Sequence, residues 1–202
     1  DLSTGGAPQA GDIKIIDQNG DGVINTDDRV IIGNPNPDFT YGFQTRFTWR
    51  GLSLSAQFNG VHGKDMINTN IRYQAIPNRT GGNLRTEAWV GAWTAENRSN
   101  AYPRVNYTLP TPAVLDRYVE DASFLRCTDI TLSYNLPKAV MKKIGFNSIN
   151  IFGSVKNAFI ITDYSGYDPE VNSFAFDGLR PGVDVSSFPH ARSFIFGLNV
   201  SF

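Results

Sequence analysis

The sequence predicts an all-β protein whose antiparallel strands form part of a transmembrane β-barrel. Five segments alternate apolar and polar residues, which is the period of an extended strand with two unlike faces. The connections between these segments alternate between long and short. Outer-membrane barrels have this arrangement, with long loops outside and short turns on the periplasmic side. The net charge of −1 leaves no basic surplus, which argues against nucleic-acid binding.

The alternation is clearest in the last segment, residues 192–202. One face of this predicted strand is apolar to its end, whereas the other face is small and mostly polar. A strand whose outer side contacts lipid has this composition. The apolar side chains are Phe194, Phe196, Leu198, Val200 and Phe202.

Four further segments repeat the pattern. Residues 39–49 and 52–60 flank Arg50-Gly51 and are predicted to form a hairpin with a two-residue turn. Residues 125–136 and 148–160 are predicted as the third and fourth strands. Each segment is long enough to cross a bilayer as a tilted strand.

The connection lengths set the predicted topology. Residues 1–38, 62–123 and 161–190 are the long loops, expected outside the cell, and 50–51 and 137–147 are periplasmic turns. Short helices are expected within 84–93 and 139–143. Two sets of side chains are then expected at the two membrane interfaces: Trp49, Leu136 and Phe202 at one, and Phe39, Tyr41 and Phe159 at the other.

A secreted, soluble β-sandwich with one buried face predicts the same alternation and is the alternative. Long and short connections in strict alternation favour the barrel. Five strands cannot close a barrel, because the smallest have eight and an open edge leaves backbone groups unsatisfied in lipid. The chain is therefore expected to be part of a larger barrel, with a loop region at 1–38 and barrel strands and loops at 39–202.

Residues 17–28 match a twelve-residue calcium loop. Oxygen ligands are expected at alternate positions, with a glycine at the sixth position for the sharp turn and a carboxylate at the twelfth. The twelfth residue is Asp rather than the usual Glu. An ordinary Asp/Asn/Gly turn is the alternative. The predicted Ca²⁺ ligands are Asp17, Asn19, Asp21, Val23 through its carbonyl group, Asn25 and Asp28.

Other polar and aromatic residues give weaker indications. His62 and His190 have no neighbours at metal-ligand spacing. The acidic residues of the 161–190 loop suggest a solvated or sugar-contacting face, and the aromatic residues of the 62–123 loop suggest either internal packing or a sugar-stacking surface. Cys127 is expected to be buried. No catalytic motif occurs, so no enzyme activity is expected. The acidic set is Asp168, Glu170 and Asp177, and the aromatic set is Trp89, Trp93, Tyr102 and Tyr107.

Several ordered motifs resemble the C-terminal part of the SusC/RagA family of TonB-linked outer-membrane transporters of Bacteroidetes. They cover nearly the whole chain: the Asp/Asn-rich stretch and following strand at 11–43, WTAENRSNAYPR at 93–104, RYVEDASFLRCTDITLSYNLPK at 117–138, YSGYDPEV at 164–171 and PHARSFIFGLNVSF at 189–202.

This resemblance implies a 22-stranded barrel with an N-terminal plug, a SusD-like surface lipoprotein as partner, and TonB-coupled import of oligosaccharides or peptides. It also implies that the last strand carries the signal read by the barrel-assembly machinery, at Phe194, Phe196, Leu198, Val200 and Phe202. The plug, the TonB box and most strands are absent from these residues. A porin-like channel or adhesin without TonB coupling remains a further alternative.

Overall fold

The computed structural model describes residues 9–75, 83–105 and 114–202, which fold into two compact units. One unit comprises Asn34–Asp65, Asp121–Val171 and Ser187–Phe202. The other comprises the described parts of Asp1–Gly33, Met66–Glu120 and Asn172–Ser186.

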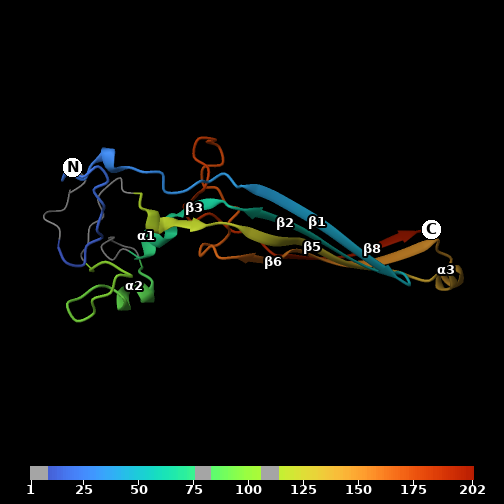
Figure 1. Ribbon diagram of the computed structural model, residues 1–202. Helices are drawn as coiled ribbons and strands as arrows, with labels where there is room; N and C mark the ends of the chain where they lie inside the picture. Colours follow the sequence, from blue (N-terminus) through green and yellow to red (C-terminus); the bar gives the residue numbers. More distant parts are fainter. Residues whose placement is uncertain (1–8, 76–82, 106–113) are drawn as a thin grey trace. The chain divides into compact units, whose positions relative to one another are not determined.

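The first of these units is built on a five-stranded antiparallel sheet (Figure 1). Its strands are β1 (Phe39–Trp49), β2 (Leu52–His62), β5 (Phe124–Asn135), β6 (Ser148–Thr162) and β8 (Ser193–Ser201), in the order β1-β2-β5-β6-β8. All five strands predicted from the alternation are confirmed. A short helix, α3 (Lys138–Ile144), connects β5 to β6 and confirms the helix expected at 139–143.

The turn between β1 and β2 fixes the register of the hairpin. Arg50 and Gly51 both have positive φ, at 46° and 88°. Such values belong to the two-residue turns whose twist matches that of antiparallel strands. The pairing then runs without interruption from Trp49 opposite Leu52 to Phe39 opposite His62.

The register changes once on each side of β5. Gln57 pairs with Asp129 but Phe58 pairs with Cys127, which leaves Thr128 as an extra residue, and β6 adjusts at Asn157, where φ is 51°. A bulge of this kind redirects the side chains beyond it. Because the shift is matched in both neighbours, Phe58, Cys127 and Phe159 stay aligned beyond the bulge, and the main apolar rows continue along one face.

The second unit contains most of the residues predicted as long loops, and these are more ordered than the sequence indicates. β3 (Asp65–Asn68), β4 (Val119–Asp121) and β7 (Val183–Asp184) form a small sheet in the order β4-β3-β7. The helices are α1 (Thr69–Ala75), α2 (Thr86–Val90) and the 3-10 turns η1 (Thr26–Asp28) and η2 (Asp116–Tyr118). α2 confirms the helix expected within 84–93, whereas β3 and α1 are too short and too irregular in pattern to be predicted.

The core of the second unit is small. Tyr118 is buried and packs against Ile13, Ile67, Ile71 and Leu115. These residues come from segments far apart in sequence, and Arg104 adds an ion pair to Asp12. The long loops are therefore held by a few apolar side chains and specific polar contacts.

No helix among the described residues is long and apolar enough to cross a membrane.

Candidate functional site

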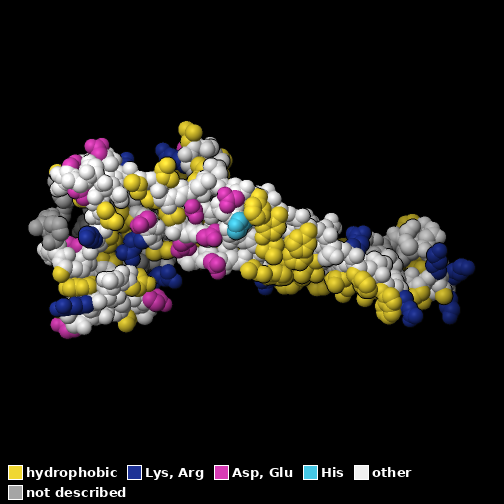
Figure 2. Space-filling view, viewed as in Figure 1, with side chains coloured by type: hydrophobic (Ala, Val, Ile, Leu, Met, Phe, Trp, Pro, Cys, Tyr) yellow, Lys and Arg dark blue, Asp and Glu magenta, His cyan; other side chains and the backbone are white. Residues whose placement is uncertain are grey.

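The five-stranded sheet has one face covered with apolar side chains that no other part of the unit covers. We call this the apolar face. Its side chains are aligned in rows by the strand register, for example Phe47, Leu54, Leu132 and Phe196 around Gly153. Phe47 is 66% exposed and Phe196 is 82% exposed. Figure 2 shows these hydrophobic side chains as a band along the strands.

An uncovered apolar surface of this extent identifies an environment other than water. The apolar side chains come from every strand, and each strand alternates them with polar side chains on the opposite face. The rows also contain aromatic pairs, such as Phe43 stacked on Phe58 with 4.5 Å between ring centroids. The pattern is that of a lipid-facing barrel wall.

Tyr41 occupies a special place near the β1 end of this face. Its ring lies over Gly60, where a Cβ atom would come within 2.3 Å of the ring. The Tyr41 hydroxyl donates to the carbonyl oxygen of Phe124 at 3.4 Å. The absence of a side chain at Gly60 therefore allows an aromatic ring to cover a sheet position that would otherwise be bare.

The opposite, polar face carries hydrogen-bonded side chains. Lys156 Nζ lies 2.6 Å from Asp129 Oδ2, and the Ser154 hydroxyl donates to the same carboxylate at 2.8 Å. Thr131 donates to Asp129 Oδ1 at 2.7 Å. These contacts link β5 to β6 and give the two faces of the sheet opposite chemical character.

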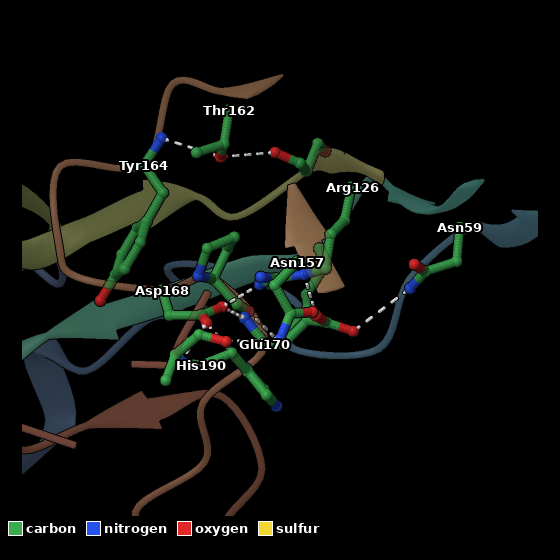
Figure 3. Close-up of polar contacts among 12 residues, drawn as sticks. Asn59, Arg126, Asn157, Thr162, Tyr164, Asp168, Glu170 and His190 are labelled. Atoms are coloured by element: carbon green, nitrogen blue, oxygen red, sulfur yellow. Dashed lines mark hydrogen bonds and ion pairs between the residues drawn. The ribbon is translucent and has the colours of Figure 1, made fainter. Parts of the chain in front are cut away.

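Beyond the bulge, Arg126 anchors the loop that follows β6. Its guanidinium group binds two carboxylates, with Nη2 2.6 Å from Asp168 Oδ1 and Nε 2.5 Å from Glu170 Oε2 (Figure 3). His190 Nδ1 lies 2.8 Å from Asp168 Oδ2. We call these four residues the Arg126 cluster. Asn59 of β2 also donates to Glu170, at 3.3 Å.

The central ion pair of the Arg126 cluster is buried. The side chains of Arg126 and Asp168 are 6% and 3% exposed. Burial acts to raise the pKa of Asp168, but hydrogen bonds from Glu170 N–H and from the His190 side chain and N–H, together with the Arg126 charge, outweigh it and lower the pKa overall. Asp168 is therefore an ionised structural carboxylate. The prediction that it belongs to a solvated face is wrong, because its side chain is buried.

Lys64 completes the charge balance on the other side of the loop. Its Nζ donates to the carbonyl oxygen of Pro169 at 3.0 Å. Burial lowers the pKa of Lys64, and the nearby Glu170 and Asp168 carboxylates partly oppose this effect. Tyr164 packs over Gly166, where a Cβ atom would lie 2.4 Å from its ring. The YSGYDPEV segment is thus fastened to β5 and β2 through its side chains.

Among the described residues, Asp168, Glu170 and His190 are the group of ligand-type side chains close enough to share a metal ion. Arg126 already pairs with both carboxylates, so a cation bound there would have to displace it. This arrangement could not be predicted from local patterns, because Arg126 and Asp168 lie 42 positions apart. The prediction that His190 has no neighbours at metal-ligand spacing is wrong, because Asp168 and Glu170 lie close enough to share an ion with it.

The predicted calcium loop is folded around its own side-chain oxygens. Asp17 accepts from Gly20 and Gly22 N–H groups at 2.7 and 2.8 Å, and Asp28 accepts from Gln18 and Asn25 N–H groups at 2.8 and 2.7 Å. Gly22 has φ of 82°, as the sixth position requires. Hydrogen bonds from Asn25 and Gln18 lower the pKa of Asp28. The donor set of carboxylate, amide and carbonyl oxygens suits a hard cation, and Ca²⁺ binding stays a prediction.

The remaining candidates have clear positions. Cys127 is buried, as expected. Trp89 is 62% exposed on α2, whereas Trp93 lies against Gly11, whose Cβ would come within 2.5 Å of its ring. Trp93 therefore packs within the second unit, which contains most of the predicted long loops and which we call the loop unit. Tyr107 lies outside the described residues.

Comparison with known proteins places this fold. TonB-dependent receptor P3 of Formosa agariphila is 33% identical over 190 residues, which cover 92% of this chain and 18% of that protein. TonB-dependent receptor P26 of the same organism is 33% identical over 200 residues, with 95% and 20% covered. TonB-dependent receptor SusC of Bacteroides thetaiotaomicron is 26% identical over 189 residues, with 93% and 17% covered. No family model matches.

The solved structures agree. A chain of the RagAB peptide transporter superposes with a TM-score of 0.73 at 26% identity, and one of the RagAB peptide importer in its open-open state with a TM-score of 0.69 at 29% identity. Each match covers 85% of this chain and 18% of the other. The chain belongs to the SusC/RagA family. This SusC/RagA chain spans about a fifth of the length of its curated relatives.

Family membership explains the two faces of the sheet. TonB-dependent receptors are outer-membrane β-barrel proteins, and the five strands of this SusC/RagA chain are a section of such a barrel wall. The chain matches receptors and importers rather than enzymes. In this setting the Arg126 cluster is a structural anchor for a loop at one end of the strands.

Proposed function

We propose that this chain is part of an outer-membrane transporter that imports oligosaccharides or peptides by TonB-coupled energy, with no enzyme activity of its own. The observation that carries the proposal is the apolar face, which is continuous over five strands and exposed. The names of similar proteins support the proposal. One relative is the TonB-dependent receptor SusC, and one similar solved structure is described as a peptide importer.

The partners follow from the same reasoning. The remaining barrel strands would pair with the free edges of β1 and β8, and a SusD-like lipoprotein would meet the loop unit outside the cell. TonB would act through the part of the protein outside these residues. Phe194, Phe196, Leu198, Val200 and Phe202 are proposed as the signal for barrel assembly.

A soluble, secreted module is the rival that the exposed apolar face disfavours. The test is to purify the intact protein that contains this chain and remove detergent. We expect it to aggregate without detergent or amphipol and to fractionate with the outer membrane. A monodisperse protein in plain buffer would contradict the proposal.

Transport needs its own test. A strain lacking the full-length protein should lose growth on one class of oligosaccharide or peptide but grow normally on the corresponding monomer. Removing TonB should give the same loss. Growth that depends on the protein but not on TonB would favour a porin-like channel.

We also propose that residues 17–28 bind one structural Ca²⁺ ion, through Asp17, Asn19, Asp21, the Val23 carbonyl, Asn25 and Asp28. Extracellular modules bind Ca²⁺ at about 10⁻⁴–10⁻³ M, so a weak site would suffice. In the full-length protein, a chelator should increase protease cleavage between residues 12 and 34. The D17A/D21A variant should already be sensitive, and D27A, which changes a carboxylate that is not a predicted ligand, should behave as the wild type. Equal cleavage with and without chelator in the wild type would contradict a bound ion.

A further inference from the structure

One end of the five-stranded sheet is purely cationic. It contains the Arg50-Gly51 turn, α3 and the end of β8. Residues 45–56, 132–153 and 194–202 include no Asp or Glu. We call this the cationic end. Figure 2 shows Lys and Arg side chains gathered around the end of the sheet where Figure 1 places α3. The cations in these ranges are Arg46, Arg50, Lys138, Lys142 and Lys143.

The opposite end of the same strands is different. Asp38 precedes β1, Asp65 follows β2, Asp121 precedes β5 and Asp163 follows β6. The cations there are engaged, since Arg126 is paired with two carboxylates and Lys64 donates to a backbone carbonyl group. The positive charge is therefore a property of one end and not of the sheet as a whole.

α3 presents its charges at a defined position. Met141 is buried, while Val140 and Ile144 are 42% and 48% exposed. The three lysines are exposed. At 100° per residue, Val140, Ile144 and Met141 fall within one third of the helix circumference, and the lysines occupy the remainder. A short helix with an exposed apolar edge beside lysines has the character of an interfacial element.

The cationic end is continuous with the apolar face. Trp49 lies in the last row of that face that all five strands share and is 58% exposed, and the Arg50 guanidinium carbon lies 5.0 Å from the centre of its ring. Tyr134, Ile151 and Leu198 belong to the same row. Cations that border a lipid-facing surface can extend along it so that their charged groups reach the headgroups. In a sheet that spans a bilayer, Arg50 and α3 would therefore lie at the level of the lipid phosphates.

We propose that Arg50 and the α3 lysines form a binding surface for anionic phospholipid headgroups, in the leaflet that the predicted topology makes periplasmic. This inference rests on the proposed function, because it requires the sheet to span a bilayer. The chemistry is the attraction of ammonium and guanidinium groups to phosphate, with no Asp or Glu side chain in these ranges to compete. An acidic protein bound at the same end would be a different partner.

The test measures lipid selectivity of the full-length protein in vesicles. Phosphatidylcholine and phosphatidylglycerol carrying a spin label on the acyl chain report motionally restricted lipid at the protein surface. We compare the wild type with K138Q/K142Q/K143Q, and with the control K14Q/R29Q/R98Q, which also removes three exposed cations but from the other unit. Heat-modified mobility in gels establishes that each variant is folded.

The wild type and the control should prefer phosphatidylglycerol over phosphatidylcholine by about fivefold or more, which corresponds to one lysine at an anionic surface. The lysine variant should lose this preference, and 1 M NaCl should abolish it in the wild type. A wild type without selectivity, or a lysine variant that keeps it, would overturn the inference and leave an acidic protein as the partner for this end. If no motionally restricted phosphatidylcholine is seen at all, the result contradicts the proposal that the sheet spans a membrane.

Discussion

Replacing Phe196 with Arg tests the lipid-facing assignment quantitatively. Phe196 lies near the middle of β8 and is 82% exposed, so its substitution removes little packing within the protein. An Arg at the bilayer midplane of a barrel costs about 2–4 kcal/mol. Losing most of the roughly 2 kcal/mol gained by transferring a Phe side chain from water adds about 1.6 kcal/mol. Phe196→Arg should therefore destabilise the protein by about 3.6–5.6 kcal/mol.

The assay is urea unfolding of the full-length protein in phospholipid vesicles, followed by tryptophan fluorescence. Asn199→Arg is the matched control, because Asn199 is exposed on the polar face of the same strand, and its change should stay under about 1 kcal/mol. Phe202→Arg should cost less than Phe196→Arg, since the Arg penalty falls to about 0–1 kcal/mol near an interface. Equal effects at positions 196, 199 and 202 would refute the assignment.

Two further predictions concern the loop anchor and the sheet. The folded-state pKa of Asp168 is lowered, so its contribution to stability is complete above its unfolded pKa of about 3.9 and is lost as pH falls through the lower folded value. Pepsin cleavage within residues 163–190 should therefore rise at the lower end of this pH window. A wild type that is cleaved as readily as Asp168→Asn at pH 5 would contradict this prediction. Gly60→Ala should displace the Tyr41 ring and break its hydrogen bond to Phe124, which should lower the free energy of unfolding in urea by about 1–2 kcal/mol. The same substitution should be nearly neutral in a Tyr41→Ala background. An equal loss in both backgrounds would argue against the Tyr41–Gly60 contact.

The strands could be predicted because their signal is local. An alternation such as that of 39–49 sorts side chains onto two faces, and a shift by one residue would place Phe47 and Trp49 on the polar side. The structure begins and ends β1 at Phe39 and Trp49, where the pattern does. Arg50-Gly51 sets the hairpin for the same reason.

The Arg126 cluster could not be predicted because it depends on distant contacts. In the sequence Arg126 is a single polar residue between the apolar residues Leu125 and Cys127. It lies next to Asp168 and Glu170 only because the strand bulges at Thr128 and the 161–190 loop folds back toward it. The fold of the loop unit has the same origin. Tyr118 packs with Ile13 and Ile67, which lie in separate stretches without a regular pattern.

The central claim is that the apolar face of the five-stranded sheet contacts lipid. It is tested most directly by attaching nitroxide labels one at a time to positions 193–201 of the full-length protein in vesicles and measuring collisions with oxygen and with a water-soluble nickel complex. We expect high oxygen and low nickel accessibility at 194, 196, 198 and 200, and the reverse at the intervening positions. Low accessibility to both reagents at the even positions would place them in a protein core and contradict the account.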